Sequence, residues 1–345
     1  MAVTIKDVSA KCGLSISTVS KAFNNYADIS LETRELVQRT AREIGYYPNA
    51  NARTLKTNRS YNLGVLFQEK RGTGLTHSFF ASVLDAFKSA GEKRGYDITF
   101  INHHIGWTGM TYLEHCRYRN VDGVCVVCAD FYAPEVIELV DSNLPVVTID
   151  HSSNNRSCVL SDNIGGLKLL VDAAYQKGHR KIAYVHGEKS SVTENRIIGF
   201  YRAMQEHGLN VNPDFVVEAL YDNPATSMQA VLNLMDRPDP PTCILLPDDH
   251  STLGAMQAAK QLNLRVPEDL SLAGYDGIRL TQMLQPRLTT IEQDTKRIGA
   301  QAAEFLIDRI ENPRTAGSET ATIPVKLLEG ESMGICPVKT DAANS

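Results

Sequence analysis

The chain has 345 residues, which indicates two to three domains, and 43 % of them are hydrophobic, enough to form substantial cores. No run of about 18 or more apolar residues occurs, so we expect no membrane span, and the first residues lack the basic start and apolar stretch of a secretory signal. The seven cysteines are scattered, which favours reduced thiols in the cytoplasm over a disulfide framework.

Charge is unevenly distributed along the chain. Residues 1–60 contain nine Lys or Arg and five Asp or Glu, a net charge of +4, so the total of −5 leaves −9 for the remainder. A basic head on an acidic body indicates that the head binds a polyanion and that the body does not. Chance clustering of solvated charge is the alternative.

Two short helices joined by a tight turn are predicted at the start of the head. The first spans "TIKDVSAKCG", where Thr4 can cap the amino end and Gly13 allows the chain to turn. Ser15 can cap the second helix, in which Val19 and Ala22 supply the inner face. The side chains left on the outer side of this second helix are Ile16, Ser17, Ser20 and Lys21.

A third helix is predicted over "LETRELVQRTAREIGY", with Ser30 as its cap. Its Leu31, Val37 and Ile44 are expected to pack back on the first two helices. Two short helices with a bracing third form a helix-turn-helix unit, in which the second helix enters the DNA major groove and residues near its N-terminus contact base edges. A three-helix bundle that binds protein, or nothing, is the alternative.

The outer face of the second helix has the chemistry to contact DNA. Lys21 can donate to guanine, Ser17 can donate or accept, and Ile16 can pack against a thymine methyl group, so we expect base contacts from these three. Phosphate contacts position a protein without specifying sequence, and we expect them from Thr4, Ser15, Thr18 and Asn24.

The segments "TIKDVSAKCGLSISTVSKAFNN" and "YYPNANARTLKT" resemble the head of the lac repressor / galactose repressor (LacI/GalR) family of bacterial transcription regulators. The chain departs from the family pattern at Cys12, where Ala is usual, and at Lys21, where Arg is usual; Lys lacks the planar fork of Arg. The resemblance implies an N-terminal all-α helix-turn-helix domain over residues 1–47 and a hinge helix with linker over 48–60.

The predicted hinge, "ANARTLK", has only about two helical turns after Pro48 and a capping Asn49, and isolated helices this short are marginal in water. We therefore expect it to fold on DNA. The resemblance implies that it pairs with a dimer mate in the minor groove, where Leu55 is an apolar wedge and Ala52 lies beside it. A plain linker helix is the alternative.

Beyond residue 60, short apolar runs alternate with amphipathic helices. This alternation predicts an α/β body of doubly wound parallel sheets, and two sets of about five strands predict two similar subdomains around a cleft. The pattern resembles the type I periplasmic-binding-protein fold that the family uses as its sensor. The implied effector-binding and dimerisation domain covers 61–340, with an N-subdomain of about 61–161 and 291–323 and a C-subdomain of about 162–290 and 324–340.

Ligands of such sheets bind beyond the carboxyl ends of the strands, where this chain has aromatic, acidic and basic side chains. Carboxylates bind hydroxyl pairs, Arg donates, and rings stack on the C–H face of a sugar, so the set suits a neutral polyhydroxylated ligand. Arg196 in "ENRIIGF" matches the family's effector arginine, while helix capping or salt bridging is the alternative for each carboxylate. The expected effector contacts are His77, Phe79, Asp150, Arg196, Tyr221, Asp248 and Asp276, with Asp249 and Trp107 as further candidates.

The sequence thus predicts a sequence-specific DNA-binding transcriptional regulator, a repressor, that acts as a homodimer on pseudo-palindromic operator DNA under the control of a small-molecule effector. A sugar or sugar derivative is the first expectation for the effector, and a purine or other metabolite is the alternative. A stand-alone sugar-binding protein is disfavoured by the basic head. No dinucleotide fingerprint, phosphate loop, catalytic triad or metal-ligand spacing is readable, so we expect no enzyme activity, cofactor or metal site.

Overall fold

The computed structural model describes residues 3–24, 26–47, 59–68, 74–105 and 108–336. The chain divides into two compact units, residues 1–61 and 62–345, which we call the head and the body. The predicted hinge residues Asn49, Ala52 and Leu55, and the candidate Trp107, lie outside the described residues. In the described part of the chain, no helix is long and apolar enough to cross a membrane.

The head is a three-helix unit with its own small core. Its helices are α1 (Ile5–Cys12), α2 (Ile16–Phe23) and α3 (Leu31–Ile44). Ser15 accepts the N–H of Thr18 at the start of α2, and Gly13 takes the left-handed conformation (φ 70°) that closes α1. The buried core comprises Val8, Val19, Ala22, Val37 and Ala41. The predicted cap and turn residues of the first two helices are therefore confirmed.

One prediction for the head is wrong. Leu31 does not pack on α1 and α2, because its side chain is 68 % exposed. Val37 and Ile44 are seven residues apart and share one face of α3, but Leu31 precedes Val37 by six residues. At roughly 100° per residue this offset turns Leu31 about 120° away from that face. Leu31, the first residue of α3, therefore faces solvent.

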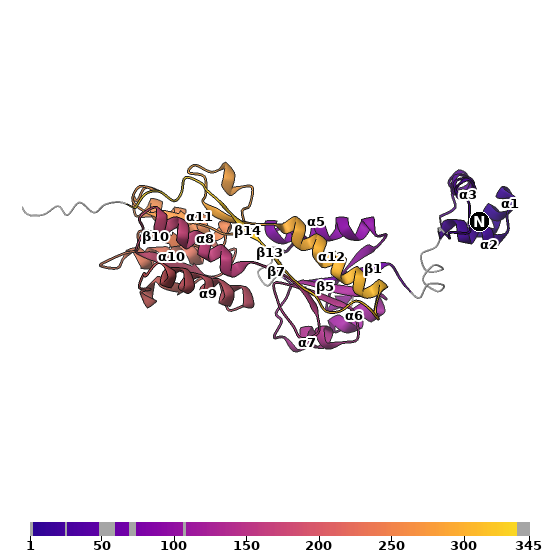
Figure 1. Ribbon diagram of the computed structural model, residues 1–345, viewed down its shortest axis with the longest axis horizontal. Helices are drawn as coiled ribbons and strands as arrows, with labels where there is room; N and C mark the ends of the chain where they lie inside the picture. Colours follow the sequence, from indigo (N-terminus) through magenta and orange to yellow (C-terminus); the bar gives the residue numbers. More distant parts are fainter. Residues whose placement is uncertain (1–2, 25, 48–58, 69–73, 106–107, 337–345) are drawn as a thin grey trace, which may run out of the picture. The chain divides into compact units, whose positions relative to one another are not determined.

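The first lobe of the body is built on a six-stranded parallel sheet in the order β13-β7-β6-β5-β1-β2. Helices α5 and α12 lie side by side on one face, and α6 and α7 cover the other (Figure 1). The strands are β1 (Asn62–Phe67), β2 (Asp97–Ile101), β5 (Gly123–Cys128), β6 (Val146–Ile149), β7 (Ser157–Ser161) and β13 (Thr320–Ile323). The helices are α5 (Ser78–Lys93), α6 (Tyr112–Tyr118), α7 (Pro134–Asp141) and α12 (Thr295–Glu311), and a small hairpin pairs β3 (His104–Ile105) with β4 (Thr108–Gly109).

The second lobe has a four-stranded parallel sheet in the order β11-β10-β8-β9. Separate apolar clusters lie under α8 with α9 and under α10 with α11, so both faces of this sheet are covered. The strands are β8 (Ile182–His186), β9 (Val216–Glu218), β10 (Cys243–Leu245) and β11 (Ser271–Ala273). The helices are α8 (Asn163–Gln176), α9 (Ser191–Glu206), α10 (Pro224–Met235) and α11 (Asp249–Gln261).

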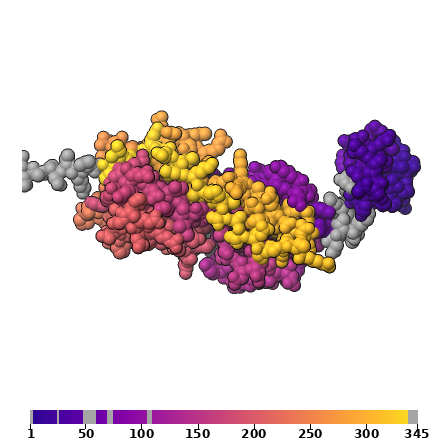
Figure 2. Space-filling view, viewed as in Figure 1, coloured from indigo at the N-terminus to yellow at the C-terminus, as the bar shows by residue number. Residues whose placement is uncertain are grey.

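The two lobes are joined by late segments of the chain. An antiparallel pair, β12 (Thr290–Gln293) with β14 (Val325–Leu328), packs against α8, while α12 and β13 belong to the first lobe. Figure 2 shows these late segments, in orange and yellow, covering part of both lobes. The predicted doubly wound parallel architecture is confirmed. The sheets have six and four strands instead of about five each, because the polar strands β7 and β13 both join the first sheet.

Candidate functional site

A cavity of about 320 Å³ lies between the lobes, beyond the carboxyl ends of the strands. Side chains after β1, β5 and β6 of the first lobe line one side, and residues of α9 and of the segments after β8, β9, β10 and β11 line the other. All seven effector contacts expected from the sequence line this cavity: His77, Phe79, Asp150, Arg196, Tyr221, Asp248 and Asp276.

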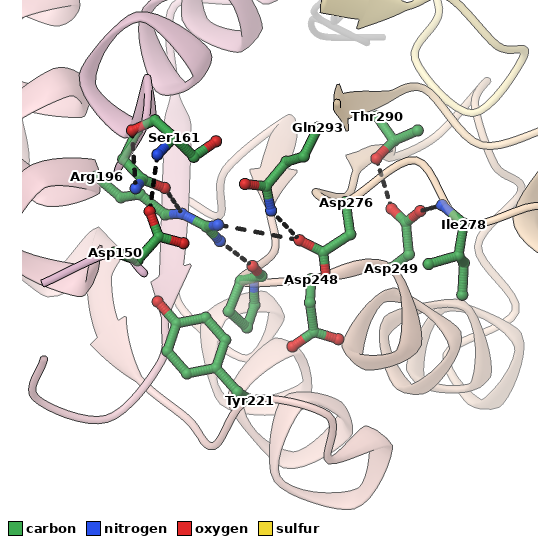
Figure 3. A network of polar contacts seen from close by, with 12 residues as sticks. Asp150, Ser161, Arg196, Tyr221, Asp248, Asp249, Asp276, Ile278, Thr290 and Gln293 are labelled. Carbon is green, nitrogen blue, oxygen red and sulfur yellow. Dashed lines mark hydrogen bonds and ion pairs between the residues drawn. The ribbon is translucent and has the colours of Figure 1, made fainter. Parts of the chain in front are cut away.

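Arg196 of α9 is the buried cation of the cavity wall, with only 4 % of its surface exposed. Its Nε donates to Oδ1 of Asn163 at 2.8 Å, and Nη1 donates to the carbonyl oxygen of Pro247 at 2.7 Å (Figure 3). The guanidinium also lies 3.5 Å from the ring centroid of Tyr275. These contacts fix the group in place and use two of its five N–H donors, so others remain for a ligand.

Asp276 lies after β11, with its carboxylate 3.9 Å from Nη2 of Arg196. The Asp276 oxygen nearest to Arg196 is Oδ1, and it also accepts a hydrogen bond from Nε2 of Gln293 at 2.7 Å. Oδ2 of Asp276 is left as an acceptor. The backbone of Asp276 has φ 105°, outside the range that side-chain-bearing residues normally adopt, which is typical of functional sites. Burial raises the pKa of Asp276 well above its usual range, and the charge of Arg196 opposes that rise.

Asp150 follows β6 and also has a positive φ, 54°. Its Oδ1 accepts the backbone N–H of Ser161 at 2.8 Å. Burial raises the pKa of Asp150, while the N–H of Ser161 and the charge of Arg196 oppose the rise. The first lobe thus contributes a second carboxylate whose pKa responds to the charge of Arg196.

The neighbouring carboxylates of Asp248 and Asp249 have different roles. Asp248 lines the cavity and caps α11, accepting the backbone N–H of Ser251 at 2.7 Å and of Asp222 at 2.8 Å. Asp249 is not part of the cavity wall. Its carboxylate accepts the N–H of Ile278 at 2.8 Å and the hydroxyl of Thr290 at 2.5 Å. The expectation that Asp249 faces a ligand is therefore wrong, because it anchors β12 to the start of α11.

Aromatic rings line the cavity from both lobes. The hydroxyl of Tyr221 shares a hydrogen bond with Thr193 at 2.9 Å, and the ring of His77 lies 4.8 Å from that of Phe80. The sequence reasoning missed a stacked pair, Phe131 and His151, whose ring centroids are 3.9 Å apart with an 8° interplanar angle. Both residues closely follow strand ends, β5 and β6, so the rule that found Asp150 would have found them.

Acidic side chains outnumber basic ones on the cavity wall. The acidic residues outnumber Arg196 and Lys189, and they are Asp130, Asp150, Glu188, Asp222, Asp248 and Asp276. An anionic ligand would meet two cationic side chains among these acidic ones, although burial raises the pKa of Asp150 and Asp276. The described residues contain no group of three or more His, Cys, Asp or Glu placed to hold a metal ion.

The head presents the outer side of α2 as expected from the sequence. Ile16 is 44 % exposed, and Nζ of Lys21 pairs with Oδ2 of Asp28 at 2.5 Å. All four predicted phosphate contacts have intramolecular roles as well: Ser15 and Thr18 share a hydrogen bond at 2.9 Å, and Asn24 donates to the carbonyl of Ser20. The fourth, Thr4, donates its hydroxyl to Asp7 at 2.8 Å, and Ser17 lies on the exposed side.

Comparison with known proteins covers both units. Residues 4–49 match the model of bacterial regulatory proteins of the lacI family, and residues 171–333 match a periplasmic binding protein-like domain. A relative from Pasteurella multocida (strain Pm70), the HTH-type transcriptional repressor PurR, is 32 % identical over 313 residues, with 89 % of this chain and 92 % of that protein covered.

Two solved structures resemble the whole chain. The Lac repressor dimer bound to operator and the anti-inducer ONPF has a TM-score of 0.78 at 25 % identity, with 97 % of this chain and 100 % of the other covered. A complex of the transcriptional regulator CelR with cellobiose has a TM-score of 0.71 at 25 % identity and coverages of 96 % and 99 %. This chain belongs to the lacI family of bacterial regulatory proteins and is a DNA-binding regulator of transcription.

Proposed function

We propose that this protein is a homodimeric repressor whose operator binding is controlled by an uncharged sugar or sugar derivative in the cavity between the lobes. The observation that carries the proposal is the arrangement of Arg196 and Asp276. Nη2 of Arg196 lies 3.9 Å from Oδ1 of Asp276. Other N–H groups of the guanidinium remain to donate to a ligand, and Oδ2 of Asp276 remains to accept. A hydroxyl both donates and accepts, so adjacent sugar hydroxyls match this pairing of donors with acceptors.

Two further features support a neutral sugar. The excess of carboxylates on the wall disfavours phosphorylated ligands. The rings of Phe131 and Tyr221 supply apolar faces in a cavity of about 320 Å³, within the size range of small-molecule sites. The family relatives named PurR favour the alternative, a purine, whose flat ring would stack on the same aromatic side chains.

For DNA, we propose base contacts from Ile16, Ser17 and Lys21 and phosphate contacts from Thr4, Ser15, Thr18 and Asn24. The exposure of Ile16 and the outward position of Lys21 support this assignment. A minor-groove role for the segment with Asn49, Ala52 and Leu55 stays a prediction. We also propose that the protein acts on DNA in the cytoplasm. In this proposal it binds its effector without chemical conversion, so it is not an enzyme.

The test is a thermal-shift screen of the full chain with three panels: neutral sugars, sugar phosphates and purine bases. We expect a concentration-dependent rise in Tm with at least one neutral sugar, since a ligand at 100 times its Kd stabilises a protein by about 2.7 kcal/mol. Stabilisation by a purine alone would replace the sugar assignment with the purine alternative. Stabilisation by sugar phosphates alone would contradict the charge argument.

A further inference from the structure

We propose that Asp28 is a positioning residue that holds the ammonium group of Lys21 for base reading and thereby sharpens the DNA sequence preference of this protein. The inference rests on the proposed function of Lys21 as a base-contacting residue. It concerns a residue outside the predicted recognition helix, in the segment between α2 and α3.

The Lys21–Asp28 pair is an exposed contact between α2 and the segment that follows it. Nζ of Lys21 lies 2.5 Å from Oδ2 of Asp28, and the two side chains are 39 % and 54 % exposed. Exposed ion pairs contribute little to stability, so this contact does little to hold the head together. In this proposal its effect is to restrict a long side chain that otherwise samples many rotamers and loses conformational entropy when it is ordered at a DNA interface.

The segment that carries Asp28 is fixed to the end of α2. The N–H of Tyr26 donates to the carbonyl of Lys21 at 3.2 Å, and Nη2 of Arg34 donates to the carbonyl of Tyr26 at 2.7 Å. The N–H of Ile29 also donates to that carbonyl at 3.2 Å, and the side chain of Ile29 packs against the head core. A carboxylate on such an anchored turn is a fixed partner for Lys21.

A carboxylate next to a base-reading lysine has two consequences on DNA. The carboxylate of Asp28, 2.5 Å from the ammonium group of Lys21, competes with the nearest phosphate for that ammonium group and so disfavours a phosphate contact. It also repels the phosphate backbone, which lowers affinity for every sequence. Asp28 therefore lowers the affinity for every DNA sequence and increases the preference at the base pair that Lys21 contacts.

The test uses the full chain and a pool of randomised duplex DNA, from which bound sequences are selected and sequenced. The variants are Asp28→Asn, Lys21→Ala and the double variant, and Glu35→Gln on α3 is the charge-matched control because it removes the same single charge from an exposed site. Tm is measured for each variant to verify folding. Affinities are then measured on the selected sequence and on a scrambled one.

We expect Asp28→Asn to tighten binding to the scrambled duplex and to reduce the preference at one base pair per half-site by about 5-fold or more, the discrimination of a single good base contact. Lys21→Ala should remove the same preference, and adding Asp28→Asn to it should change the profile no further. Glu35→Gln should leave the profile intact, and Asp28→Glu, which keeps the charge, should restore part of the preference.

The possible failures are distinct. A wild-type chain that selects no motif would refute the proposed DNA function itself. A wild-type motif that Lys21→Ala leaves unchanged would refute the base-reading role of Lys21 and, with it, the role of Asp28. A motif that depends on Lys21 but keeps its full preference in Asp28→Asn would overturn the positioning role alone and reduce Asp28 to an electrostatic effect on general affinity.

Discussion

The hydroxyl of Ser191 donates a hydrogen bond to the main-chain carbonyl oxygen of Asp150 at 2.7 Å. Ser191 is the first residue of α9 in the second lobe, and Asp150 directly follows β6 in the first. This bond spans the cavity between the lobes, and both residues line it. It stabilises the arrangement in which side chains of the two lobes surround a ligand together.

Replacing Ser191 with Ala should therefore weaken effector binding without removing any predicted ligand contact. A typical intramolecular hydrogen bond contributes about 0.5–1.5 kcal/mol, so we expect an increase in Kd of about 2- to 12-fold, measured by calorimetry with the sugar that stabilises the protein best. Ser82→Ala is the matched control, because the hydroxyl of Ser82 donates only within α5, to the carbonyl of Ser78. Equal Kd values for wild type and Ser191→Ala would show that the link does not favour the bound arrangement.

Asp276→Asn should abolish the effector response and preserve operator binding. The amide oxygen of Asn can still accept from Gln293, so the fold is retained, but the acceptor Oδ2 is replaced by an amide group that can only donate. We expect no ligand-induced rise in Tm and no effect of ligand on DNA retention in a gel. A variant that responds to the sugar as wild type does would disprove the assignment of Asp276 to the effector site.

Arg196→Met should destabilise the body strongly. The guanidinium is buried against the ring of Tyr275 and donates to Asn163 and to the carbonyl oxygen of Pro247, so removing it leaves both acceptors unpaired. A buried polar group left unsatisfied costs about 1–3 kcal/mol. Urea unfolding should show the loss, and a loss below about 1 kcal/mol would mean that water already reaches the site.

The stability of the body should decrease between about pH 4 and pH 7 through Asp249. Burial raises the pKa of this carboxyl to about 7 in the folded state, against 3.8 for the ordinary group. A raised folded pKa means that the contribution is fully present below the ordinary pKa and is lost as the pH rises through the folded value. The difference of about 3 units corresponds to at most about 4 kcal/mol.

Asp249→Asn isolates this contribution, because its amide keeps an oxygen for Ile278 and can donate to the hydroxyl of Thr290. The free energy of unfolding of the variant should depend less on pH than that of wild type over this window. Parallel curves for the two proteins would place the pH dependence on other carboxyls.

Light scattering of the full chain at micromolar concentration should give twice the 38.0 kDa chain mass. A pseudo-palindromic operator requires two heads related by two-fold symmetry, and one head offers few contacts for tight specific binding. A mass of one chain, in the presence and absence of operator DNA, would contradict the proposed homodimer.

Much of the cavity could be predicted because parallel strands bring their carboxyl ends to one edge. That rule gathered His77, Asp150 and Asp276 from distant parts of the sequence into one wall. The same rule could not predict that Asp248 lines the cavity and that Asp249 does not. Two adjacent carboxylates at the start of a helix differ in the direction in which each points, and the direction of Asp249 is fixed by its hydrogen bond with Thr290 of β12. The sequence did not predict the role of Asp28, because no pattern links an acidic residue in a turn to a lysine seven positions earlier. The ion pair with Lys21 is visible only in the structure.

The late segments of the chain that join the two lobes limit which parts of the body could be exchanged between genes. The first lobe contains β1 to β7 and then α12 and β13, so it is encoded in two separate stretches with the second lobe between them. Exchange of one continuous stretch of the gene cannot transfer the first lobe intact. The head, in contrast, is one continuous stretch with its own caps and core. New operator specificities can therefore be acquired by a single gene fusion, whereas exchange of the first lobe of the sensor requires two separate stretches of the gene.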